Sequence, residues 1–159
     1  MKVLAIDPGY DRIGLAVLDN ATGSDTLLFS TCLVTDRQTD FSKRLLVLGE
    51  TVTTLLSKYG PDTVAIETLF FNKNIKTAIH VAEARGVLLY LAEKAGATLH
   101  EFGPQEIKVA TTGYGKSDKT AVLAMVKRLV KQVPDHALDD EYDAIAVGIT
   151  CLAQYGRGR

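Results

Sequence analysis

The sequence predicts an α/β domain built on a mixed five-stranded sheet, with the element order βββαβαβααα. Short apolar runs that end at turn residues are typical of buried strands, and other segments repeat apolar residues at helical spacing. Hydrophobic residues make up 47% of the 159 positions, which is enough to fill one core. No repeat, linker or low-complexity tract divides the chain, so we expect a single domain over residues 1–159.

Five segments have the strand pattern, namely residues 2–6, 13–19, 26–34, 63–67 and 98–102. The first of them, KVLAI, runs directly into the turn sequence Asp7-Pro8-Gly9, and a second turn sequence, ATGSD, precedes the third. Because only short turns separate the first three strands, we expect them to form an antiparallel meander. The last two strands each follow a predicted helix.

Five segments have the helical pattern, namely residues 40–58, 73–95, 104–111, 118–131 and 139–154. The long second helix is apolar on two nearly opposite faces, although a helix that covers a sheet needs only one. The second apolar face must therefore pack against other helices of the same chain or against another subunit. A symmetric dimer through this helix is an open hypothesis. The interface residues would be Val81, Ala84, Leu88 and Leu91.

The charged residues are unevenly distributed, although the net charge is only −1. That small value argues against a protein that coats nucleic acid along its whole surface. The segment 105–131 is nevertheless rich in lysine and arginine, whereas 132–156 has neither and contains five acidic residues. A basic segment beside an acidic one is the arrangement expected of a phosphate-binding surface next to a metal site.

The two cysteines, Cys32 and Cys151, lie far apart and do not have the spacing of metal ligands. We expect buried free thiols in a reducing cytosol. No apolar run approaches the roughly 18 residues that span a bilayer, and the chain begins directly with a strand-like segment. These features favour a cytoplasmic protein.

Four carboxylates carry the chemical signal. Asp7 ends the first strand and Glu67 ends the fourth, so the two side chains share one sheet edge if those strands are parallel neighbours. Asp140 and Asp143 are three residues apart and lie on one helix face. Converging carboxylates repel one another unless cations are present, and an all-oxygen ligand set suits Mg²⁺ or Mn²⁺.

Each acid also has an ordinary structural interpretation. Asp7 precedes Pro-Gly and could be a turn residue, Asp139 or Asp140 could cap a helix, and Glu67 could pair with a lysine. The joint occurrence of two strand-end acids and an i, i+3 acid pair favours a metal site. Such a site hydrolyses phosphodiesters: one ion activates a water and a second stabilises the departing oxygen. The scattered histidines do not form a nucleophile triad with any serine.

At this point the sequence resembles a known family, the RuvC-type Holliday-junction resolvases of the RNase H-like superfamily. The resemblance covers nearly the whole chain in the family's order. It rests on the stretches AIDPGYDRIGLAV, AIETLFFNKN, EARGVLL, GPQEIKVATTGYGKSDKTAV and DDEYDAIAVGIT. The glutamate-bearing loop and the GKSDK segment are the most specific of these.

The resemblance implies an RNase H-like fold and a homodimeric endonuclease that cuts four-way DNA junctions by paired symmetric nicks. It also implies two Mg²⁺ or Mn²⁺ ions per site, a branch-migration helicase as partner, and a bacterial cytoplasmic location. The implied catalytic and metal-binding residues are Asp7, Glu67, Asp140 and Asp143. The implied DNA-binding residues are Phe70, Lys108 and Lys119, with Phe71 as the alternative aromatic contact. Lys73 is a further candidate, and so is Lys116, because the glycines beside it allow close approach to a phosphate.

The sequence departs from the family pattern in its first motif, where DRIGLAV is closer to the YqgF-type RNA-processing nucleases. Those nucleases lack the AIET strand end and the GKSDK segment. The family places either aspartate or histidine at the position of Asp140. Two further alternatives remain, a catalytically silent junction-binding module and a fragment of a sugar-kinase or actin-like ATPase. The second would need two such domains, and this chain has room for one.

The backbone amides that begin helix 118–131, together with Ser117, are a further candidate anion site.

Overall fold

A mixed five-stranded sheet forms the centre of the computed structural model, which describes residues 1–68 and 75–156. The strand order is β3-β2-β1-β4-β5. The first three strands pair antiparallel, and β4 and β5 continue the sheet in parallel beside β1, so the predicted meander and mixed sheet are confirmed. The strands are β1 (Lys2–Asp7), β2 (Arg12–Asp19), β3 (Thr26–Val34), β4 (Thr63–Glu67) and β5 (Thr98–Phe102).

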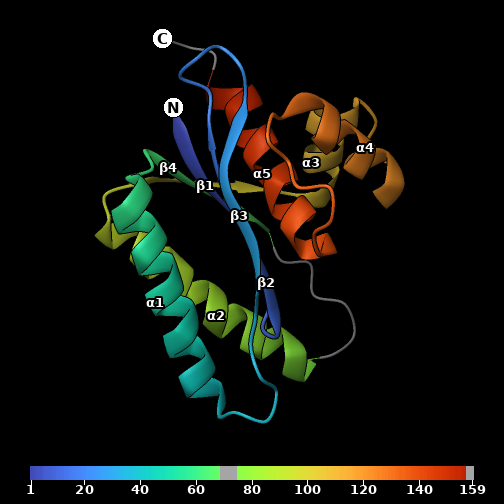
Figure 1. Ribbon diagram of the computed structural model, residues 1–159. Helices are drawn as coiled ribbons and strands as arrows, with labels where there is room; N and C mark the ends of the chain where they lie inside the picture. The colour runs from blue at the N-terminus through green and yellow to red at the C-terminus, as the bar shows by residue number, and fades with distance from the viewer. Residues whose placement is uncertain (69–74, 157–159) are drawn as a thin grey trace.

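Helices cover both faces of this sheet (Figure 1). One pair lies on one face and three helices lie on the other, and every predicted element is present within two residues of its expected ends. The first pair is α1 (Phe41–Tyr59) and α2 (Ile75–Lys94). The other three are α3 (Pro104–Thr112), α4 (Lys119–Leu129) and α5 (Asp139–Tyr155).

The core has two layers because the side chains of each strand alternate between the two faces. Along β1, Val3 and Ala5 face the layer of α5, whereas Leu4 and Ile6 face the layer of α1 and α2. Small residues let α5 lie close to the sheet. A Cβ atom on Gly148 would stand 2.4 Å from the side chain of Leu18. The middle of α5 therefore lies directly against the strands.

Part of the face of α2 that was expected at a subunit interface is turned into the core of the chain. Ala84 and Leu88 are each only 1% exposed, inside the layer that also contains Leu48 of α1. These two side chains pack within the chain itself, which corrects their assignment to a dimer contact. The large apolar side chains that α2 exposes among the described residues are Ile79 and Tyr90.

Both cysteines are free thiols, as expected. Cys151 is buried, whereas Cys32 is only half-buried. Across residues 1–68 and 75–156, none of the helices has the length and apolar character needed to cross a membrane.

Candidate active site

Parallel pairing of β1 and β4 brings two acids together at the sheet edge. Ile6 of β1 is in register with Ile66 of β4, so Asp7 and Glu67 follow side by side at the carboxyl ends of neighbouring strands. The predicted pairing of the two strand-end acids is therefore confirmed.

The first turns of α5 bring the other two acids to the same place. Gly14 of β2 lies opposite Asp7, and a Cβ atom there would stand 1.8 Å from the backbone oxygen of Asp140. Only glycine allows this close approach, so Gly14 permits α5 to begin beside Asp7. The N-cap of α5 is Leu138, without a side-chain cap, and the alternative of Asp139 or Asp140 as capping residue is therefore wrong.

The acids repel one another strongly. Burial raises the pKa of Asp7 to about 8, with further contributions from Glu67, Asp143 and Asp140. Burial and the neighbouring Asp143 also raise the pKa of Glu67, against the opposing effects of Asp7 and Lys108. The pKa of Asp143 is raised as well, mainly by burial. The site therefore favours either bound protons or bound cations near neutral pH.

A cavity of about 150 Å³ opens beside these acids and is lined by both acidic and basic side chains. Its acidic members are Glu67 and Asp143, and its basic members are Lys108 of α3 and Lys119 of α4. The apolar part of its wall consists of Pro104, Ile107, Val122 and Ala146. The predicted neighbourhood of two lysines and the acids is thus present in the structure.

Lys119 pairs with two carboxylates. Its Nζ lies 3.1 Å from Oδ2 of Asp143 and 3.2 Å from Oδ2 of Asp139. Although burial acts to lower it, these contacts raise the pKa of Lys119. The lysine is therefore a fixed positive charge at the edge of the acid cluster.

A second cation contacts the acids from the other side. Arg12 is the first residue of β2, and its Nη2 lies 2.9 Å from Oδ2 of Asp140. The two groups are close but not aligned, and the buried Oδ2 accepts no hydrogen bond from any described residue. Sequence reasoning noticed the unusual motif around Arg12 but assigned it no function, because the partner lies at the far end of the chain.

The residues present fit a divalent metal ion. Within the described ranges no three acidic, histidine or cysteine side chains already surround one point closely enough to hold an ion. The donors are nevertheless all carboxylate oxygens, the set that Mg²⁺ and Mn²⁺ prefer. A cation near Asp7 would stabilise its ionised form and so lower its raised pKa. The same cation would interact with the buried Oδ2 of Asp140, which has no hydrogen-bond partner among the described residues. Lys119 and Arg12 each already neutralise part of this charge.

Only some of the DNA-binding candidates can be placed. Phe70, Phe71 and Lys73 lie outside the described residues. Lys116 is exposed in the loop between α3 and α4. This loop is tied together by Thr112, whose hydroxyl contacts Ser117 Oγ at 2.7 Å and accepts from the amide of Tyr114.

The candidate anion site at the start of α4 is wrong. The N-cap of this helix is Asp118, whose side chain accepts a hydrogen bond from the amide of Ala121. Its carboxylate occupies the helix start and repels a second anion, and Ser117 is already engaged with Thr112.

Comparison with known proteins gives the family. The family model "Crossover junction endodeoxyribonuclease RuvC" matches residues 3–151. The chain belongs to the RuvC family. It is 44% identical over 153 residues to the crossover junction endodeoxyribonuclease RuvC of Thermosipho melanesiensis, a match that covers 96% of this chain and 97% of the relative.

Solved structures of the RuvC family have the same fold. A Thermus thermophilus RuvC in complex with Holliday junction substrate superposes with a TM-score of 0.90 at 28% identity, over 97% of this chain and 94% of that one. Another Thermus thermophilus RuvC structure gives a TM-score of 0.85 at 30% identity, over 98% and 97%. The expected RNase H-like fold is thereby confirmed, and the RuvC family is favoured over the YqgF-type alternative.

Proposed function

We propose that this chain is a metal-dependent endonuclease that resolves four-way DNA junctions by nicking two opposing strands. One observation carries the proposal: Asp7, Glu67, Asp140 and Asp143 meet at one sheet edge in a chain of the RuvC family. Four partly buried acids that lie close together cost stability, and such an arrangement is typical of a functional site. The relative from Thermus thermophilus forms a complex with a Holliday junction, which supports the choice of substrate.

The four carboxylates would hold two Mg²⁺ or Mn²⁺ ions. When bound, the ions would supply an activated water and stabilise the departing 3′ oxygen of the phosphodiester. The chain itself supplies orientation and charge. Lys108 and Lys119 line the cavity beside the acids, where they would bind phosphate oxygens of the cleaved strand.

A symmetric pair of nicks needs two such sites, so we propose a homodimer. The buried side chains of Ala84 and Leu88 support the fold of each subunit instead, and the exposed face of α2 with Ile79 and Tyr90 would supply the contact. The proposed setting is the bacterial cytoplasm, with a branch-migration helicase as partner.

The test is cleavage of a labelled four-way junction in Mg²⁺ or Mn²⁺, beside linear duplex DNA and an RNA hairpin. We expect paired symmetric nicks near the crossover of the junction and no cleavage by Asp7→Asn. The matched control is Asp36→Asn, which changes an exposed acid in the loop after β3 and should cleave like the wild type.

Other outcomes would replace the proposal. RNA cleavage with the junction left intact would assign the chain to RNA processing. Tight junction binding without cleavage in either metal would identify a recognition module, and the mechanism above would be wrong.

A further inference from the structure

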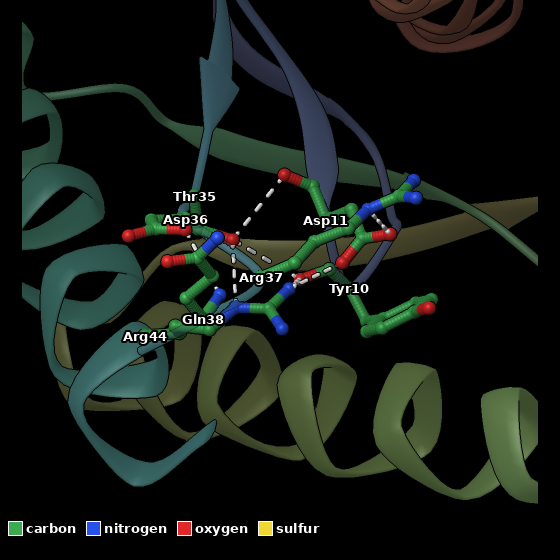
Figure 2. Close-up of polar contacts among 7 residues, drawn as sticks. All are labelled: Tyr10, Asp11, Thr35, Asp36, Arg37, Gln38 and Arg44. Atoms are coloured by element: carbon green, nitrogen blue, oxygen red, sulfur yellow. Dashed lines mark hydrogen bonds and ion pairs between the residues drawn. The ribbon is translucent and has the colours of Figure 1, made fainter. Parts of the chain in front are cut away.

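Two arginines lie beside the turn that follows Asp7, and they differ in burial and in how many of their N–H groups are hydrogen-bonded. Arg44 of α1 is buried, at 7% exposure, whereas the side chain of Arg12 is 49% exposed. Figure 2 shows the surroundings of Arg44. Its Nε donates to Thr35 Oγ1 at 2.9 Å, and its Nη2 donates to the backbone oxygen of Tyr10 and to Asp11 Oδ1.

The second oxygen of Asp11 is also occupied, because Nε of Arg37 lies 2.7 Å from Oδ2 (Figure 2). Asp11 and Arg44 thus form a completed ion pair that anchors the turn to α1. The next residue along the chain, Arg12, contacts Asp140 at the start of α5 instead. Clamping of Asp11 fixes the backbone from which the Arg12 side chain extends.

The contact between Arg12 and Asp140 is not a completed pair. Nη2 of Arg12 lies near Asp140 Oδ2, but this buried oxygen receives no aligned hydrogen bond from the described residues. A half-exposed pair of this kind contributes little to stability. A guanidinium has five N–H donors in a planar fork that fits phosphate oxygens, so most of the donor capacity of Arg12 is still available.

The position of Arg12 is suited to a phosphate. In the strand order, β1 with Asp7 is central, β4 with Glu67 lies on one side and β2 with Arg12 lies on the other. Lys108 and Lys119 line the cavity beside Glu67. Positive groups therefore flank the four acids on both sides, as a DNA strand that crosses them would require, since its successive phosphates extend beyond the reacting one.

We propose that Arg12 binds a backbone phosphate of the DNA strand, next to the phosphodiester that is cut, while it holds Asp140 in place. The inference rests on the proposed nuclease function for its substrate class. It adds a DNA contact on the β2 side of the site, opposite the two lysines.

The test measures junction binding without cleavage, in EDTA, by fluorescence anisotropy over a series of salt concentrations. Arg12→Ala should weaken binding roughly tenfold, which corresponds to one charge-assisted hydrogen-bonded contact. It should also reduce the slope of log affinity against log salt by about one. Arg12→Lys should restore the slope but only part of the affinity, because an ammonium lacks the planar fork.

The matched control is Arg37→Ala, which removes the same side chain from an ion pair outside the acid cluster. It should change neither the affinity nor the slope, since Arg44 still holds Asp11. An unchanged slope in Arg12→Ala, with unaltered circular dichroism, would overturn the assignment of Arg12. The same drop in both variants would attribute the effect to general charge and would also overturn it.

The two proposals fail differently. If the wild type binds the junction with the expected slope change at Arg12 but never cleaves in Mg²⁺ or Mn²⁺, the nuclease function fails and the Arg12 contact stands. If the wild type cleaves while Arg12→Ala binds normally, only the Arg12 contact fails. If the wild type does not bind a junction, both are wrong.

Discussion

Two charged clusters adjoin the turn after β1, and they differ in whether the charges within each cluster attract or repel one another. In the Arg44–Asp11 cluster, opposite charges meet and both oxygens of Asp11 are paired. In the acid cluster of Asp7, Glu67, Asp140 and Asp143, like charges meet, and burial together with these neighbours raises the pKa of Asp7 to about 8. The first cluster stabilises the fold, whereas the second opposes folding, which agrees with the proposed binding of a cation there.

The largest expected effect separates the acid cluster from the fold. Asp7 holds its proton more tightly in the folded state than in the unfolded state. Protonated Asp7 therefore stabilises the fold fully below a pH of about 4, and this stabilisation is lost as the pH rises through about 8. The metal-free protein should therefore lose up to about 5 kcal/mol of unfolding free energy between these values. Asp7→Asn should remove most of this dependence. Urea unfolding in EDTA at several pH values measures it.

Adding Mg²⁺ at pH 8.5 should restore stability to the wild type more than to Asp7→Asn, because the ion replaces the lost protons. A wild-type curve that is flat between pH 5 and pH 8.5 would contradict the description of Asp7 as a buried, repelled carboxyl.

A second effect, of about 3–5 kcal/mol, should come from breaking the satisfied cluster. Arg44→Ala removes a buried, hydrogen-bonded cation and leaves the carboxylate of the buried Asp11 with only the exposed Arg37 as partner. Equilibrium unfolding in urea measures the loss. Arg37→Ala, whose side chain is 78% exposed, should cost less than about 1 kcal/mol. Equal costs for both variants would show that the buried arginine has no special structural role.

The smallest effect concerns the cation at the edge of the acid cluster. Lys119→Ala should weaken junction binding by roughly tenfold or less and reduce the salt slope by about one, since one phosphate contact is lost. Lys58→Ala, which removes an exposed lysine of α1 on the other side of the sheet, should leave the slope unchanged. If both variants give the wild-type slope, Lys119 does not contact a DNA phosphate and only pairs with Asp139 and Asp143.

The described strands and helices, and the meeting of Asp7 with Glu67, were predictable from the sequence. Their causes are local: apolar periodicity sets each element, turn residues end it, and the carboxyl ends of parallel strands share an edge. The apolar face of α2 that packs inside was not predictable in the same way. Both faces of this helix are apolar, so periodicity alone does not distinguish the side that buries Ala84 and Leu88.

The sequence by itself therefore determined the elements, their order and the four acids, because these depend on neighbours along the chain. Tertiary structure alone decided which cation meets which acid. Arg44 pairs with Asp11 across 33 residues, and Arg12 contacts Asp140 from the opposite end of the chain. Such pairings depend on how β2, α1 and α5 pack around one turn, since charge attraction selects a partner only after packing has placed it within reach.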